Sequence, residues 1–288
     1  GYVKQIAPFT SDLDDLSQRL FQLTTNGGQE YCGYVIHTSL NELNWDTASS
    51  NYKVIFISGN EDFLQGNISY TLACTEAKKK GVIVNTIYCG DRVQGIKEHW
   101  NLLGECGNGS FTNINSDAKP VDIPTPYDST LITLNNKLNG TYIYYGANGR
   151  DKKELQASMD VANSSINSYA GVNRAVSKAS SKTYYNSTWD LVDAKTDDKK
   201  ILDKVDPKTL PDSLQKKSKT ELEAIINQKS NERVAIQREI QDISKKRETY
   251  IANEKINKAR AGKNSKTLES EVEKIIREQA TRFNMKIE

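Results

Sequence analysis

The chain has 288 residues, enough for one large domain or for one domain with an accessory region. Its composition, 36% hydrophobic and 26% charged, is polar but is not that of a disordered chain. The net charge of +2 gives no reason to expect nucleic acid or an acidic membrane as the main partner. No apolar run approaches the ~20 residues of a transmembrane helix.

Strands and helices alternate along the first 115 residues. The apolar run Val54-Ile55-Phe56-Ile57, bounded by polar residues, is typical of a strand buried on both faces. The predicted elements, in chain order, are a strand at 2–6, helices at 11–23 and 30–43, a strand at 54–57, a helix at 69–80, a strand at 82–88, a helix at 95–103 and a strand at 110–114. This order predicts an α/β fold with a parallel sheet covered by helices.

The sequence changes character after Pro120. Pro124 and Pro126 indicate a linker, and the remainder is charged and helical. Apolar residues recur at three- and four-residue steps over 221–259 and 267–283, which predicts a helical hairpin or coiled coil able to self-associate. The alternative is a charged amphipathic helix that folds back on its own domain. We therefore expect three regions, at 1–118, 119–194 and 195–288.

Four segments together resemble a von Willebrand factor type A (VWA) domain of the bacterial kind that has a long helical tail. They are NGGQEYCG, KVIFISGNEDFLQG, KKKGVIVNTIYCGD and GSFTNI. The resemblance covers about residues 1–117, and RAVSKAS, STWDLVDA and LPDSL resemble the tails of such proteins more weakly. It implies a Rossmann-like VWA domain followed by a mainly helical, partly coiled-coil region.

The chain departs from this family at its start. The first strand of the family carries a DxSxS loop, and nothing similar occurs here, so the chain corresponds to the family from its third strand onward. In the family sheet order, 3-2-1-4-5-6, the missing strands would lie beside residues 54–57. Without them that strand exposes an apolar edge, which folded proteins avoid. We expect a fragment of a longer protein; the alternative is a minimal three-strand domain.

The resemblance places a ligand-binding rim at the carboxyl ends of the strands. Gln29 and Asn60 match metal-ligating positions of the family but carry neutral amides, whereas hard cations prefer carboxylates. Mg²⁺ or Ca²⁺ is thus expected only if a longer chain supplies DxSxS. The competing interpretation is a turn whose acidic residues favour the positive end of the next helix. The candidate rim residues are Gly27, Gly28, Gln29, Glu30, Asn60, Glu61, Asp62 and Asp91.

The four cysteines allow two pairings. Cys32 opens the helix after the Gly-Gly turn and Cys89 ends a predicted strand, so both should lie at the carboxyl edge of the sheet. Cys74 and Cys106 lie on neighbouring predicted helices. A Cys74–Cys89 bond is excluded because the helix and the strand run in opposite directions between them. Free buried thiols are the alternative to either disulfide.

Catalysis is not expected from these residues. Cys89 and His99 could form a nucleophile and base, but the predicted helix carries His99 away from the strand end. The tyrosines of 141–146 and 183–189 are expected to be core residues, with an aromatic recognition surface as the alternative.

The sequence therefore predicts a non-enzymatic protein-binding or adhesion module of a secreted, periplasmic or cell-envelope bacterial protein, with no resident cofactor and an unknown protein partner. One alternative is a structural protein that oligomerises through helices 221–283. The other is a metal-dependent ligand-binding VWA domain completed by upstream sequence.

Overall fold

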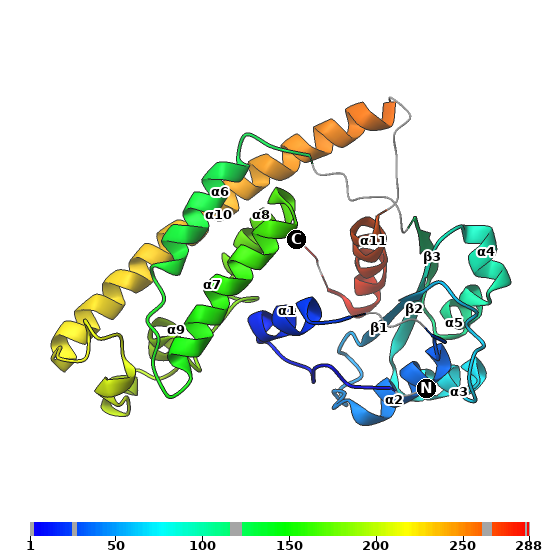
Figure 1. The fold of residues 1–288 in the computed structure, drawn as a ribbon, viewed down its shortest axis with the longest axis horizontal. Coiled ribbons are helices and arrows are strands. Elements are labelled where there is room, and N and C mark those ends of the chain that lie inside the picture. The colour runs from blue at the N-terminus through cyan, green and yellow to red at the C-terminus, as the bar shows by residue number, and fades with distance from the viewer. Residues whose placement is uncertain (1–2, 25–27, 116–122, 261–266, 286, 288) are drawn as a thin grey trace. The chain divides into compact units, whose positions relative to one another are not determined.

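The computed structural model divides the chain into two compact units (Figure 1). The structure describes residues 3–24, 28–115, 123–260, 267–285 and 287. Unit 1 comprises Gly1–Phe9, Thr24–Val121 and Lys263–Glu288, and unit 2 comprises Thr10–Leu23 and Asp122–Gly262. This division differs from the three predicted regions, because the first helix belongs to unit 2 and the last helix to unit 1.

Unit 1 contains a parallel sheet of three strands in the order β1-β2-β3 among the described residues. The strands are β1 (Val54–Gly59), β2 (Ile83–Cys89) and β3 (Phe111–Ile114). Val54 pairs with Ile83, and Thr86 pairs with Phe111. The predicted α/β class is confirmed. The predicted strand at 2–6 is wrong for residues 3–6, which form no strand, and within the described chain β1 pairs with β2 alone.

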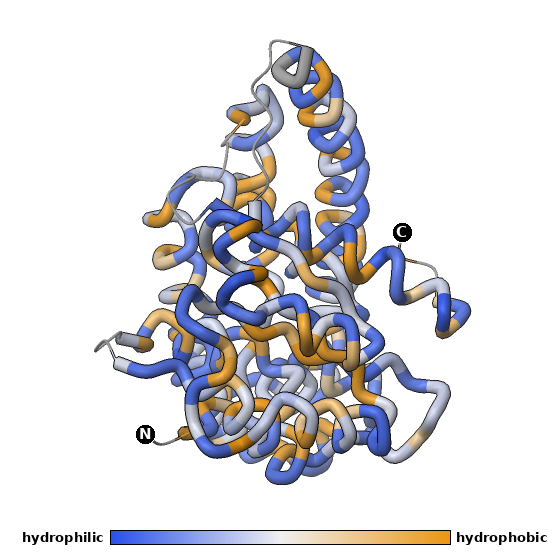
Figure 2. Tube along the Cα trace, turned by 90° about the vertical axis from the view of Figure 1, so that its right-hand side faces the viewer, coloured by the Kyte–Doolittle hydropathy of each residue, from blue (hydrophilic) through white to orange (hydrophobic). Residues whose placement is uncertain are grey.

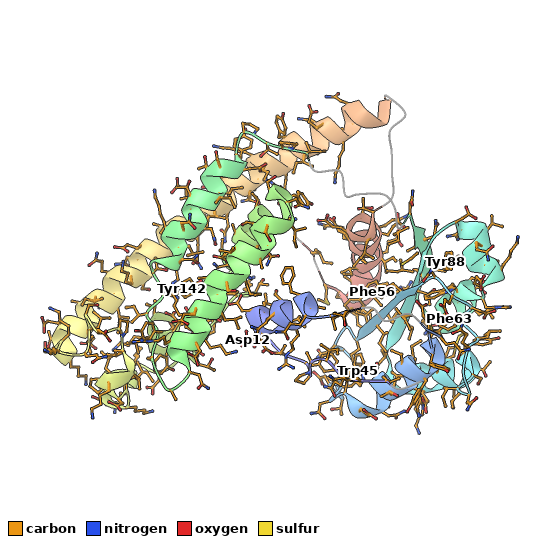
Figure 3. All side chains as sticks on the ribbon, viewed as in Figure 1. Asp12, Trp45, Phe56, Phe63, Tyr88 and Tyr142 are labelled. Carbon is orange, nitrogen blue, oxygen red and sulfur yellow. A yellow bond between two sulfur atoms is a disulfide. The ribbon has the colours of Figure 1, made fainter. Side chains whose placement is uncertain are left out.

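Four helices of unit 1 follow the pattern expected from the sequence. They are α2 (Cys32–Glu42), α3 (Tyr70–Lys80), α4 (Arg92–Lys97) and α5 (Trp100–Cys106). The single helix predicted at 95–103 is divided, because His99 adopts a left-handed conformation with φ of 66°. Fully buried Trp100 lies in the core, where its ring centroid lies 5.0 Å from that of Phe63 and 5.9 Å from that of Tyr88. Phe63 and Tyr88 are labelled in Figure 3.

The last helix, α11 (Leu268–Ala280), packs on the sheet of unit 1. The amides of Asn85 on β2 and Gln279 on α11 exchange two hydrogen bonds, of 2.7 and 3.1 Å, and both side chains are buried. Thr112 of β3 donates to Glu271. The predicted hairpin of residues 221–259 and 267–283 would span the two units; within unit 1, polar groups on one face of α11 match polar groups of the sheet.

A disulfide joins Cys74 of α3 to Cys106 at the end of α5, with 5.8 Å between the Cα atoms. It is one of the two pairings that the sequence left open. Cys32 and Cys89 are free thiols.

Unit 2 is helical. Its elements are α1 (Leu13–Phe21), α6 (Asp128–Asn139), α7 (Gly149–Ile166), α8 (Ser168–Lys178), α9 (Leu191–Asp197), two 3-10 turns (Ile201–Asp203 and Pro207–Thr209) and α10 (Lys219–Arg260). Figure 2 shows apolar positions at intervals along the otherwise hydrophilic α10. Ile236, Ile240 and Ile243 join the core formed with α6 and α8. The stripe on α10 thus has partners in its own unit, as the alternative interpretation expects.

Several tyrosines of unit 2 are core residues. Tyr142 and Tyr184 are buried, and Tyr142 stacks on Trp189 at 5.8 Å. The guanidinium of Arg233 lies 4.0 Å from the Tyr142 ring centroid and pairs with Asp190 and Asp193. Burial raises the pKa of Asp193 to about 6, and Arg233 offsets this only in part.

A second buried ion cluster links α1, α7 and α8. Arg174 contacts Asp14 at 2.6 Å and Asp160 at 2.5 Å, and Lys178 lies 2.8 Å from Asp160. Burial lowers the pKa of Lys178 to about 8, so its ammonium remains charged at neutral pH. Burial alone would raise the pKa of Asp160, but Lys178 and Arg174 hold it below its ordinary value.

Replacement of Gln279 tests how α11 is held. Gln279→Ala leaves the buried Asn85 amide without two of its hydrogen bonds, and we expect the free energy of unfolding of unit 1 to fall by about 1–3 kcal/mol. Native-state hydrogen exchange of β2 amides measures this loss. Lys274→Ala, an exposed change on the same helix, should alter the free energy of unfolding of unit 1 by no more than about 0.5 kcal/mol. Equal effects of the two changes would contradict the role of the amide pair.

Replacement of Asp160 tests the ion cluster. Because its folded pKa lies below the unfolded one, the stability it contributes is present above about pH 4 and is lost as the pH falls further. Asp160→Asn leaves buried Lys178 without its acidic partner, and should cost unit 2 about 3–5 kcal/mol and flatten this acid dependence. Hydrogen exchange of α7 and α8 peptides during urea unfolding, at several acidic pH values, measures both effects. The exposed change Asp151→Asn on α7 is the control.

Candidate functional site

The carboxyl edge of the sheet, where β1 and β2 end, brings together most of the predicted rim. Gly59 and Tyr88 are paired there, so the loops that follow the two strands start side by side. The described rim residues Gln29 and Glu30 precede α2, Asn60 to Asp62 follow β1, and Asp91 follows β2. Gly27 lies outside the described residues.

Glu30 connects two of these loops. Its carboxylate oxygen Oε2 accepts hydrogen bonds from the backbone N–H groups of Asn60 (3.2 Å) and Glu61 (3.5 Å). Its own N–H donates to Gln65 Oε1 at 2.7 Å. A Cβ at Gly59 would lie 2.1 Å from Oε2 of Glu30 and 2.9 Å from the Trp100 ring, so only glycine fits beneath this clamp. The clamp fixes the start of α2 against the β1–α3 loop.

The remaining acidic residues also make hydrogen bonds within the loops. Glu61 accepts from Gln65 Nε2 at 2.9 Å, and its carbonyl accepts from Trp100 Nε1 at 2.7 Å. Asp62 accepts from the N–H of Leu64 and lies 3.3 Å from His99 Nδ1. These carboxylates stabilise the turn after β1, but they do not lie at the start of the next helix, because α3 begins at Tyr70 and is capped by Ser69.

Asp91 and Gln29 have local partners as well. Asp91 caps α4 by accepting from the N–H groups of Val93 (2.8 Å) and Gln94 (3.2 Å). Gln29 accepts from the hydroxyl of Tyr31 at 2.6 Å. Gly28 precedes them with φ of 126°, a conformation that other residues rarely adopt.

The donor set at this edge does not fit a divalent cation. Within the described chain no group of three His, Cys, Asp or Glu residues could hold a metal. The carboxylate of Glu30 is occupied by backbone N–H groups, and Gln29 and Asn60 offer only neutral amides.

The two free thiols are in environments that disfavour the thiolate. Burial, together with the nearby charge of Glu30, raises the pKa of Cys32 to about 12. Burial and Glu30 also raise the pKa of Cys89. A nucleophilic cysteine needs the opposite shift, and the ring of His99 contacts Asp62. Among the described residues, His99 therefore does not activate Cys89.

A cavity beside the clamp was not predicted. It measures about 310 Å³ and lies between the start of α2, with Tyr31 and Tyr34, and the β1–α3 loop, with Asn67 and Ile68. The chain adopts φ of 90° at Gly66, where a Cβ would lie 2.4 Å from the Tyr31 ring. The spacing of the two tyrosines places them on one side of a helix, but only the folded loop supplies the opposite wall.

Comparisons with known proteins give no relative. No protein-family model, curated protein or solved structure matches the chain. None of the helices in the described ranges combines the length and the apolar character needed to cross a membrane.

Replacement of Gly59 tests the clamp. Gly59→Ala places a methyl group against Glu30 and Trp100, and overpacking of this kind should cost unit 1 about 1–3 kcal/mol. Thermal unfolding monitored by hydrogen exchange of the β1–α3 loop measures the loss. In the double variant Gly59→Ala, Glu30→Ala, the loss of stability should be smaller than the sum of the two single losses, because one of the clashing groups is gone. Strict additivity would show that the two residues are not coupled.

Proposed function

We propose that unit 1 is a protein-binding module and that the carboxyl edge of its sheet is the binding surface. The observation that carries this proposal is the Glu30 clamp, which holds two loops together beside a cavity lined by Tyr31 and Tyr34. A surface fixed before binding loses less conformational entropy on association. Tyrosine is enriched among the residues that dominate binding energy, and Tyr34 is 40% exposed.

The resemblance to VWA domains is part of the same proposal. Three parallel strands flanked by helices, with loops gathered at the carboxyl edge, agree with it. In this chain the interaction would use hydrogen bonds and aromatic contacts, because the residues present do not form a metal site.

We also propose that the protein is exported to the periplasm, the cell envelope or the medium. The Cys74–Cys106 disulfide supports this location, because disulfides persist in oxidising compartments and are rare in the cytosol. Self-association through residues 221–283 receives no such support. These residues belong to two units, and Ile236, Ile240 and Ile243 of α10 already pack within unit 2, although Val234, Tyr250 and Ile256 are exposed.

Site-specific photo-crosslinking tests the binding surface. A photoreactive residue at Asn67, beside the cavity, should give an adduct with one protein, while the same residue at Lys79, at the opposite end of α3, should not. Once the partner is identified by mass spectrometry, Tyr34→Ala should weaken its affinity by at least about tenfold.

The matched control is Tyr250→Ala, which removes a similarly exposed tyrosine from α10 and should leave the affinity unchanged. Equal cross-linking from Asn67 and Lys79, or an unaltered affinity of the Tyr34→Ala variant, would contradict the proposal.

A further inference from the structure

The amino edge of the same sheet, where β2 begins, contains a second and larger cavity. It measures about 500 Å³ and is lined by residues far apart in the sequence, among them Lys78 at the end of α3 and Arg282 after α11. Ser49 and Asn108 add polar groups, and Ile83 and Phe283 form an apolar part of the wall. Its volume lies in the range of small-molecule sites.

The fold of unit 1 fixes Arg282 at this cavity. The amide pair between Asn85 and Gln279 holds α11 on the sheet. Immediately after α11, the ring of Phe283 contacts that of Tyr52 at 5.3 Å between centroids. Arg282 lies between these two anchors and donates one N–H to the carbonyl of Asn108 at 2.9 Å. The position of its guanidinium therefore depends on contacts within unit 1.

The two basic side chains lack acidic partners. Among the described residues neither Lys78 nor Arg282 forms an ion pair, and the residues that line the cavity include no carboxylate. The buried arginines of unit 2 differ, because Arg174 and Arg233 each contact two aspartates. Two unpaired cations that meet in one cavity attract an anion.

Lys53 and the carboxyl end of α3 also lie beside the cavity. Lys53 approaches Gly81 from the side and donates to the carbonyl of Asp46, whose carboxylate is bound to the N–H of Ala48. The carboxyl end of α3 presents the negative end of a helix dipole, which the three lysines at 78–80 offset.

We propose that this cavity binds a phosphate group, carried either by a small organic phosphate or by the headgroup of a phospholipid. The guanidinium of Arg282 has N–H groups left to contact phosphate oxygens in a bidentate manner, and Lys78 supplies a second charge. The side chains of Ser49 and Asn108 are further donors, and the ring of Phe283 contacts the organic part. The site is independent of the carboxyl edge.

The test uses the full chain and two probes. Calorimetry measures binding of glycerol 3-phosphate, and flotation measures binding to phosphatidylcholine vesicles with and without phosphatidylglycerol. We expect saturable binding of at least one probe, and a loss of about tenfold or more for Arg282→Gln and for Lys78→Gln. Binding of the free phosphate alone identifies a soluble ligand, and binding that depends on phosphatidylglycerol identifies a headgroup; both support the site.

Lys79→Gln is the matched control, because it removes the same charge from the same helical turn but lies outside the cavity lining. Its affinity should stay within about twofold of the unchanged protein. Arg282→Lys keeps the charge but loses the planar guanidinium group. Its affinity for the probe should lie between that of Arg282→Gln and that of the unchanged protein. The proposal is overturned if neither probe saturates below about 10 mM, or if Lys79→Gln weakens binding as much as Lys78→Gln. Unchanged hydrogen exchange of β2 in each variant confirms that the fold persists.

Discussion

The buried amide pair between Asn85 and Gln279 joins the centre of the sheet to a helix 194 residues further along the chain. Each amide satisfies the other where water is excluded, and Asn85 also accepts from the N–H of Ser110 at 2.8 Å. An unpaired amide at either position would cost more than the pair contributes. This requirement selects α11 as the cover of the sheet and, with it, positions Arg282 and Phe283.

The charged side chains at the two edges of the sheet in unit 1 have different surroundings. At the carboxyl edge, the acidic side chains accept hydrogen bonds from nearby backbone N–H groups. Glu30 binds the loop after β1, Asp91 caps a helix, and Asp62 closes a turn. The result is a polar surface held in place by hydrogen bonds, on which the proposed protein contact rests. At the amino edge, Lys78 and Arg282 line a cavity and form no ion pair with any residue that the structure describes, and the proposed phosphate site rests on them.

Unit 2 shows a different use of buried charge. Asp14, Asp160 and Arg174 meet inside a helical unit, where desolvation is costly and every member needs a partner. Such a cluster adds little net stability, but it admits few alternative arrangements. It explains why α1 packs on α7 and pairs with Arg174 of α8 although its flanking segments belong to unit 1.

The sequence by itself determined the local elements and the sheet class. The apolar runs at 54–57 and 82–88 predicted β1 and β2, and the α/β alternation predicted a parallel sheet, because strand and helix periods are properties of short segments. The turn after β1 was predicted from Gly59 and its acidic neighbours for the same reason. Residues 3–6 have a strand-like composition but form no strand, since pairing needs a neighbour that composition does not specify.

Only the tertiary structure decided which distant segments meet. The apolar stripes of α10 and α11 are similar in sequence, yet α10 packs within unit 2 and α11 packs on the sheet of unit 1. Which unit each helix joins depends on single polar residues. Gln279, for example, stabilises the packing of α11 only because Asn85 lies opposite it in the folded chain. The same holds for the clamp of Glu30 and for the cavity that Lys78 and Arg282 both line, because hydrogen bonds and charges act through space and not along the sequence.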